Sequence, residues 1–303
     1  MKDNFVNLHL HSMFSLQDSV IKFDDLVDIL KKYRQISCAI TDHASTAGWV
    51  VFDKIMRENN LKPIFGNEFY CIESYNLPKS KRRDHLVLLA MNNEGVVNIQ
   101  RMQNVSVQHF YYRPILDYNT LKNNIDGLYC TSACSLGTIS KYILDKKYDK
   151  AEDYALKFDD WFNGNFSLEL QFHPDYPDQK IINEYLVQIS EKYNIPLTVS
   201  CDSHFLDEEN KEVRKAIQAA AWHKNINEIN DSLSSNCVGN SEIILENAKL
   251  SGFEHIDLVN KAINQTKIIS DLCNASLSEK NRKIPKFNKR TELNKMFDKV
   301  GNW

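Results

Sequence analysis

Histidine and carboxylate side chains follow short apolar runs at four widely separated points of this 303-residue chain. Short apolar runs are typical of buried strands. The carboxyl ends of parallel strands meet at one face of an α/β barrel, where active sites are built. The pattern therefore predicts a metal site with several ions at the mouth of a barrel. The residues that carry it are His9 and His11, Asp42 and His43, Glu68, and Asp202 and His204.

The spacing within two of these groups supports a shared metal site. His9 and His11 are two residues apart, and side chains two apart on a strand point to the same face. Asp202 and His204 repeat this spacing. Imidazole and carboxylate ligands suit Zn, Mn or Fe, and suit Mg alone poorly. One such pair is equally compatible with a half-buried strand, but several at strand ends favour metal binding.

Strand patterns alternate with helical patterns along the first two thirds of the chain, which predicts βα units and a parallel sheet. About seven units are present, so we expect an α/β fold, a distorted (β/α)7 TIM-like barrel, as one domain over residues 1–280. His85 precedes its apolar run, so either its loop folds over the mouth or the strand assignment is weaker there. The expected strands are 5–8, 37–40, 62–65, 85–90, 127–130, 167–170 and 196–199.

The remainder of the chain has a different character. Apolar periodicity predicts helices over residues 24–33, 47–59, 210–223 and 256–273. Residues 281–303 begin with a basic stretch broken by a proline. We interpret that segment as a linker or docking tail.

Composition limits the class of protein. With 43% hydrophobic and 25% charged residues, the chain has ordinary globular composition. The net charge of -3 argues against coating nucleic acid by bulk charge, but leaves room for a local basic patch. No apolar run reaches the roughly 18 residues of a membrane span, and the start lacks a signal-peptide core. Seven scattered cysteines without a Cys-x-x-Cys pair favour a reducing, cytoplasmic location.

Several motifs resemble a known family. Residues 9–18, His-Leu-His-Ser-Met-Phe-Ser-Leu-Gln-Asp, resemble the first motif of PHP (polymerase and histidinol phosphatase) domains. Later PHP motifs are matched in order by residues 41–43, 66–70, 85–90 and 201–204. Residues 110–114 and 132–134 resemble, more narrowly, the PHP domains of bacterial DNA polymerase III alpha subunits.

This resemblance implies a trinuclear site with nine ligands. Glu68 would bridge two ions, and Cys134 would bind as a thiolate whose pKa the metal lowers. Among the ligands, the resemblance gives His11, Glu68 and Asp202 the central catalytic positions. The implied sets are His9, His11, Glu68 and Asp202 for one ion, Glu68, His85 and Cys134 for a second, and Asp18, His43 and His204 for a third.

Clustered divalent ions suit the hydrolysis of phosphate esters, because they activate water and stabilise the leaving oxygen. We therefore expect a metal-dependent phosphoesterase, foremost a 3′-5′ exonuclease acting on single-stranded DNA or a DNA 3′ end. A Ser-His-Asp hydrolase is disfavoured, because the chain has no Gly-x-Ser-x-Gly elbow.

Two other functions stay open. The chain could be the non-catalytic N-terminal part of a split or truncated polymerase alpha subunit. Its tail would then dock onto polymerase or other replisome subunits. It could also be a small-molecule phosphomonoesterase of the histidinol phosphatase type.

Candidate substrate-binding residues are fewer and less specific. Arg82, Arg83 and Arg113 could track a phosphate backbone, although a basic run is more often a solvated loop. Tyr111 and its neighbour Tyr112 could stack on bases, but core packing is the favoured interpretation. His173 follows a strand and could orient substrate or another site residue.

Overall fold

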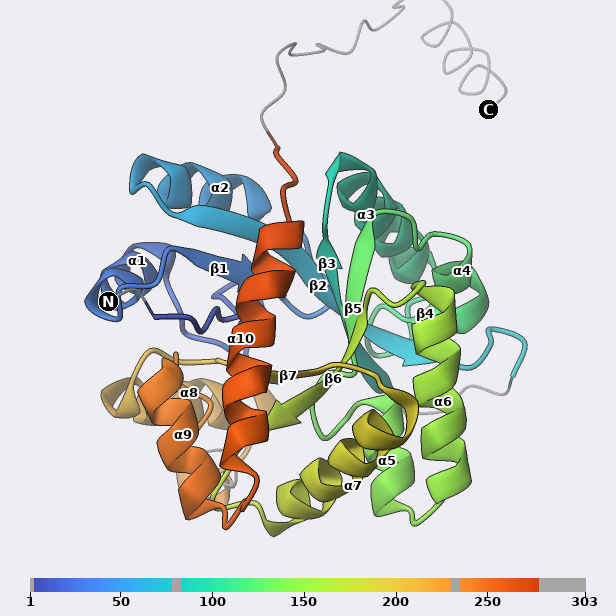
Figure 1. Ribbon diagram of the computed structural model, residues 1–303. Coiled ribbons are helices and arrows are strands. Elements are labelled where there is room, and N and C mark those ends of the chain that lie inside the picture. Colours follow the sequence, from blue (N-terminus) through green and yellow to red (C-terminus); the bar gives the residue numbers. More distant parts are fainter. Residues whose placement is uncertain (1–2, 78–82, 230–234, 278–303) are drawn as a thin grey trace, which may run out of the picture.

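The computed structural model describes residues 3–77, 83–229 and 235–277. Its centre is a curled seven-stranded sheet, with helices around it (Figure 1). The strand order is β1-β2-β3-β5-β6-β7, and the short β4 pairs with β2 off this path. The strands are β1 (Ser37–Ile40), β2 (Lys62–Ile72), β3 (Asp84–Ala90), β4 (Leu116–Asp117), β5 (Leu128–Thr131), β6 (Phe166–Gln171) and β7 (Leu197–Ser200).

The N-terminal segment closes the sheet into a barrel. Asn7 bridges Cys38 of β1, and Leu10 bridges Ser203, just after β7, both in parallel. The backbone N–H of His11 donates to the carbonyl of Ser203 at 2.8 Å. The expected strand over residues 5–8 is thus a line of isolated bridges instead of a regular strand. The α/β class and the distorted TIM-like barrel are confirmed.

The expectation of an entirely parallel sheet is wrong at β3. This strand pairs antiparallel with both β2 and β5. The described residues between β2 and β3 include no crossover helix, and the polypeptide direction reverses from one strand to the next. The N-terminal end of β3 therefore lies beside the C-terminal half of β2, where Tyr70 pairs with His85. This reversal explains why His85 precedes its apolar run and still reaches the mouth of the barrel.

The helices pack on the sheet through apolar stripes. In α1 the buried residues Phe23, Leu26, Val27 and Leu30 follow helical spacing. The helices are α1 (Phe23–Lys32), α2 (Trp49–Glu58), α3 (Asn93–Gln108), α4 (Tyr118–Lys122), α5 (Thr138–Leu144), α6 (Tyr148–Trp161), α7 (Pro177–Tyr193), α8 (Glu208–Trp222), α9 (Ser241–Leu250) and α10 (Ile256–Leu272), with a 3-10 turn at Ile226–Glu228.

Helix α10 covers the end of the barrel away from the mouth. The Ser270 carbonyl accepts a hydrogen bond from Lys62, and the Ser270 hydroxyl bonds the hydroxyl of Ser37. Ser37 and Lys62 begin β1 and β2. Ile269 packs in a cluster with inward-facing residues such as Val87. Helix α10 does not cover the opposite end of the barrel, where a functional site can form (Figure 1).

Other expectations can be compared with the fold. The predicted helices 24–33, 47–59, 210–223 and 256–273 are found as α1, α2, α8 and α10, with ends shifted by one or two residues. In the described part of the chain, no helix is both long and apolar enough to cross a membrane. The predicted tail, residues 281–303, lies outside the described residues.

Candidate metal centre

The two ends of the sequence pattern meet at the mouth of the barrel. His9 and His11 come from the N-terminal segment, and Asp202 follows β7. The Nε2 atoms of His9 and His11 each lie 3.2 Å from Oδ1 of Asp202. These three side chains are almost entirely buried, so an open solvent shell does not satisfy their polar atoms.

Glu68 on β2 lies at the centre of the cluster. Its carboxylate is 1% exposed, although a buried charge without partners would be costly. Nitrogens of four imidazoles lie close to it, and so does one thiol. The distances are 3.3 Å to His9, 3.4 Å to His11, 2.7 Å to His43, 2.8 Å to His85, and 3.8 Å to Sγ of Cys134.

Asp18 anchors a third region of the cluster. Its Oδ2 lies 3.1 Å from Nε2 of His43 and 3.3 Å from Nε2 of His204. Its Oδ1 accepts hydrogen bonds from Arg214 at 2.8 Å and from Gln218 at 2.9 Å. Both donors lie on α8, and the sequence did not single them out. They fix the orientation of the Asp18 carboxylate.

The donor atoms of the cluster fit divalent metal ions. Five buried atoms of the cluster make no hydrogen bond of acceptable geometry, although pairs of them lie 2.7–3.4 Å apart, and such atoms are rare among buried polar groups. They are Nε2 of His9, Nε2 of His11, Nδ1 of His43, Oε2 of Glu68 and Oδ1 of Asp202. In three groups of residues the ligand atoms lie within 4.8 Å of one another. The first group is His9, His11 and Asp202; the second is His43, Glu68 and His85; the third is His11, His43 and His204. Buried atoms of these types, left without partners and converging, are what metal coordination would satisfy.

Electrostatics keeps the carboxylates of the cluster ionised. Burial alone would raise the pKa of Glu68, but the surrounding imidazoles outweigh it and hold that pKa well below its usual value. The pKa of Asp202 is lowered in the same way, chiefly by His9 and His204. Burial opposes protonation of His43, yet Glu68 and Asp18 raise its pKa to about 10. The carboxylates are therefore ionised, the form in which they can bind cations.

Cys134 follows a different rule. Burial, and then the nearby Glu68 carboxylate, raise the pKa of this thiol well above its ordinary value. Its Sγ lies 3.5 Å from Nδ1 of His85. A thiolate here would therefore need a cation beside it.

A layer of buried polar residues orients the inner side chains, and the sequence reasoning missed it. Glu169 on β6 accepts a hydrogen bond from Nδ1 of His9 at 2.8 Å, which directs Nε2 toward the cluster. Glu169 also accepts hydrogen bonds from Thr131, Gln171 and Ser200. The available signal was a carboxylate in the middle of an apolar strand run.

A second relay orients His11. Its Nδ1 bonds the Ser15 hydroxyl at 3.0 Å, and that hydroxyl donates to Asp42 at 2.7 Å. Asp42 also accepts from the backbone and side chain of Ser12. The sequence pattern placed Asp42 at the mouth correctly. The structure brings it to the cluster as a support for His11.

Three residues in or beside the cluster have a positive φ. Asp202 has a φ of 48°, and Ala133, next to Cys134, has a φ of 59°. Positive φ is uncommon outside glycine and recurs at functional sites. Ala44, which follows His43, has a φ of 43°. These turns direct the neighbouring side chains toward the mouth.

The candidate substrate-binding residues are placed unequally. Arg113 is exposed, with its guanidinium 5.8 Å from the ring centre of Tyr70. That ring lies 5.3 Å from His43, so Arg113 is at the rim of the cluster. Arg83 donates to the carbonyl of Tyr111 at 2.9 Å. Arg82 lies outside the described residues.

Two further expectations can be judged. The interpretation of the tyrosine pair as core is wrong for Tyr112, which is 65% exposed. His173 is buried, and its nitrogens contact Ser235 at 2.7 Å and Gln171 at 3.2 Å. Because Gln171 donates to Glu169, His173 belongs to the layer behind His9.

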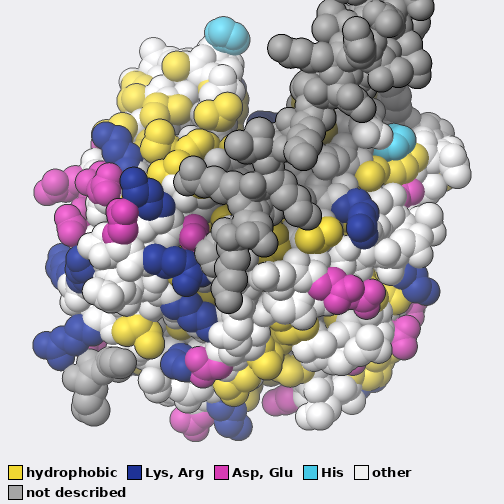
Figure 2. Space-filling model, turned by 90° about the horizontal axis from the view of Figure 1, so that it is seen from above, with side chains coloured by type: hydrophobic (Ala, Val, Ile, Leu, Met, Phe, Trp, Pro, Cys, Tyr) yellow, Lys and Arg dark blue, Asp and Glu magenta, His cyan; other side chains and the backbone are white. Residues whose placement is uncertain are grey.

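Charge on the face seen in Figure 2 is mixed. Lys and Arg side chains are scattered among Asp and Glu side chains over this face, and hydrophobic side chains gather in one part of it. This distribution agrees with the small net charge.

Fold and site together define an α/β barrel protein with a buried histidine and carboxylate cluster at the mouth. The sequence profile of the PHP domain matches residues 7–173, more than half of the chain, so this chain belongs to the PHP domain family.

Two relatives of this chain share one name. The DNA polymerase III subunit alpha of Borreliella burgdorferi is 37% identical over 214 residues, covering 69% of this chain and 19% of that protein. The protein of the same name from Aquifex aeolicus is 32% identical, covering 76% of this chain and 21% of its own length. The chain therefore spans about a fifth of the length of these relatives.

Proposed function

We propose that this protein is a metal-dependent phosphoesterase that hydrolyses phosphodiester bonds at the 3′ end of single-stranded DNA. The observation that carries the proposal is the cluster of buried imidazole and carboxylate atoms without hydrogen-bond partners. Membership of the PHP domain family supports the chemistry. The name DNA polymerase III subunit alpha, carried by the relatives, supports a DNA substrate.

Nine residues would hold three divalent ions, of Zn, Mn or Fe. Bound there, the ions would supply an activated water molecule and positive charge for the leaving oxygen. His11, Glu68 and Asp202 form the centre of this proposed active site, with Glu68 as the bridging carboxylate. The full proposed ligand set is His9, His11, Asp18, His43, Glu68, His85, Cys134, Asp202 and His204.

The chain's own residues would prepare the site and position the strand. Glu169 holds the tautomer of His9 that presents Nε2 inward, because Nδ1–H donates to its carboxylate. The carbonyl of Asp202 does the same for His204, accepting from Nδ1 at 2.7 Å. We propose that Arg113, Arg83 and Arg82 contact phosphates of the approaching strand. His173 would act indirectly, through Gln171.

The relatives support a role in DNA replication or proofreading. On the strength of the name that these relatives carry, we propose that this chain works with polymerase or other replisome subunits. Residues 281–303 would be the docking segment. A pull-down with and without this segment tests the assignment, which fails if both forms capture the same partners.

Hydrolysis of a labelled oligonucleotide tests the proposed activity. We expect the purified chain with added Mn2+ or Zn2+ to shorten single-stranded DNA from its 3′ end, and a chelator to abolish the reaction. His11→Ala and Asp202→Ala should each lower the rate at least about 100-fold, because each removes an inner ligand. Metal content, measured on the same samples, should fall in parallel.

Two controls separate the proposal from its alternatives. Lys180→Ala, an exposed change distant in sequence from the cluster, should leave the rate unchanged. Faster turnover of a small phosphomonoester than of the oligonucleotide would instead assign the site to a phosphomonoesterase. Metal binding without any hydrolysis would indicate a structural role.

A further inference from the structure

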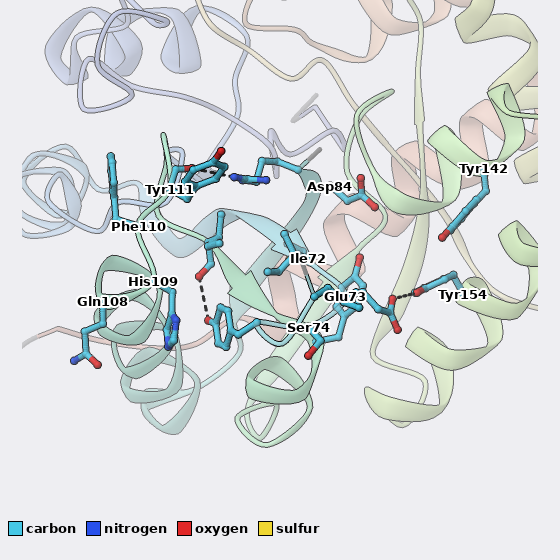
Figure 3. A pocket seen from close by; sticks show the side chains of 16 residues that line it. Ile72, Glu73, Ser74, Asp84, Gln108, His109, Phe110, Tyr111, Tyr142 and Tyr154 are labelled. Atoms are coloured by element: carbon cyan, nitrogen blue, oxygen red, sulfur yellow. Dashed lines mark hydrogen bonds between the residues drawn. The ribbon is translucent and has the colours of Figure 1, made fainter. Parts of the chain in front are cut away.

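An aromatic cavity lies beside the metal centre, outside the cluster of proposed ligands. Its volume is about 420 Å3. Phe110 and His109 line one side, and Tyr142 and Tyr154 line the other (Figure 3). Ile72 and the segment that follows it form the floor between them. A cavity of this size is within the range of small-ligand sites.

The walls of the cavity offer flat ring surfaces. The rings of Tyr75 and His109 stack with centroids 3.6 Å apart and planes within 9°. Phe110 is 62% exposed, although it carries no polar group. This ring lies at the edge of the cavity, where a ligand could reach its face. Flat rings of this kind bind planar heterocycles by stacking.

The acidic groups at the cavity have basic partners. Asp84 accepts a hydrogen bond from Lys141 at 2.9 Å. Glu73 accepts one from the Tyr154 hydroxyl and lies 3.9 Å from Lys157. Arg83 adds positive charge at the wall. A polyanion is therefore not repelled from the opening, and the carboxylate of Glu73 and the hydroxyl of Ser74 leave polar atoms for the edge of a base.

The cavity lies across one strand pair from the metal centre. In the pairing of β2 with β3, Tyr70 lies opposite His85, and Cys71 lies opposite Asp84. His85 is a proposed ligand, whereas Cys71 and Asp84 line the cavity. Because successive side chains of a strand point to opposite faces, the cavity and His85 lie on opposite faces of this strand pair, near its end. Tyr70 packs against His85, with ring centres 5.1 Å apart.

A basic path joins the two sites on the outside. Arg113 lies over the ring of Tyr70. Its backbone pairs with that of Tyr111 in an isolated β-bridge. Tyr111 lines the cavity, and the guanidinium of Arg83 lies 5.4 Å from its ring centre. Backbone phosphates could follow Arg113 and Arg83, because guanidinium groups pair well with phosphate oxygens.

We propose that this cavity binds a nucleobase of the substrate strand, from a nucleotide close to the bond at the metal centre. The inference rests on the proposed function for its ligand class. Three features support the proposal: the aromatic rings that line the cavity, the basic partners of its acidic groups, and the arginines between the cavity and the metal centre. A base held there would fix the register of the strand end without reading its sequence, because every base has a face that stacks.

The proposal is tested by combining oligonucleotides that lack one base with a protein variant that lacks the ring of Phe110. The metal-loaded full chain is titrated with oligonucleotides whose terminal linkages are phosphorothioates, so that cleavage does not interfere. Phe110→Ala should weaken binding about tenfold, the loss of one base–aromatic stack. An abasic residue near the 3′ end should weaken binding of the unmodified chain by a similar factor at one position only. At that position Phe110→Ala should add little, because both changes remove the same contact.

The matched controls are Phe110→Tyr, which keeps the ring and should bind normally, and Val107→Ala, an exposed residue of α3 outside the cavity. Equal losses by Phe110→Ala on intact and abasic strands would overturn the proposal, as would no loss at all. Binding that depends on Phe110 without any hydrolysis of ordinary DNA would count against the proposed activity alone. Absence of DNA binding by the unmodified chain would overturn both.

Discussion

At the scale of single residues, the inner side chains and their supports differ in how they appear in the sequence. His9 and His11 are visible because their spacing of two on an extended segment turns both inward. Glu169 is not visible in this way, since it lies within a strand and its partner His9 is 160 positions away. A buried carboxylate in an apolar run required a partner, but only the sheet order identifies which one.

The position of Glu169 leads to a prediction about metal affinity. Glu169→Gln keeps the size of the side chain but removes the charge that favours the Nδ1–H tautomer of His9. We expect the affinity for Mn2+ or Zn2+ to fall about 10- to 100-fold, as for other residues that orient metal ligands. Isothermal titration of the metal-free chain measures this directly.

The control is Glu184→Gln, the same change at an exposed position on α7. It should leave the affinity unchanged. An unchanged affinity for Glu169→Gln would show that the His9 tautomer does not depend on this carboxylate.

At the scale of elements, the contact of α3 with β5 depends on a glycine. A Cβ built on Gly95 would lie 2.1 Å from the carbonyl oxygen of Gly127, which immediately precedes β5. Alanine normally favours a helix by up to about 1 kcal/mol. Here the backbone contact should reverse the sign.

We expect Gly95→Ala to lower the free energy of unfolding by about 1–3 kcal/mol, the usual cost of overpacking. Urea unfolding followed by circular dichroism measures the change. Val97→Ala, at an exposed position of the same helix, should change stability by less than about 0.5 kcal/mol. A stabilised Gly95→Ala variant would mean that α3 can move away from β5 without cost.

The prediction from the sequence was wrong for the direction of β3, which runs antiparallel to its neighbours. A short apolar run such as Leu86–Ala90 has the same pattern whether it runs parallel or antiparallel. The pairing with β2 decides the matter, since Cys71 near the end of β2 lies opposite Asp84 at the start of β3. The position of His85 before its run, instead of after it, was the available clue.

At the scale of the whole molecule, buried histidines couple stability to pH. Burial lowers the pKa of His173 to about 4, and burial together with Arg214 lowers that of His204 to about 4. Both values lie below the ordinary 6.5, so folding favours the neutral imidazoles. The contribution of these two histidines to the free energy of unfolding is complete above pH 6.5 and is lost as the pH falls toward 4.

We therefore expect the metal-free chain to lose stability between pH 6.5 and 4. His173→Gln should remove a part of this dependence worth about 3 kcal/mol at most. Unfolding by urea at a series of pH values, in a chelator, measures the slope. His255→Gln, at an exposed histidine, is the control and should preserve it. An identical slope for His173→Gln would contradict the assignment.

The sequence alone determined the α/β class, most strand positions, four of the helices, and the candidate residues at the mouth, because periodicity and spacing are local properties. The resemblance to PHP domains added Asp18, His85 and Cys134 to that set. Only the tertiary structure decided the closure of the barrel by isolated bridges, the reversal of β3, the support of His9 by Glu169 and the aromatic cavity beside His85. These depend on which distant segments become neighbours in space, and a pattern within one segment does not specify its partners.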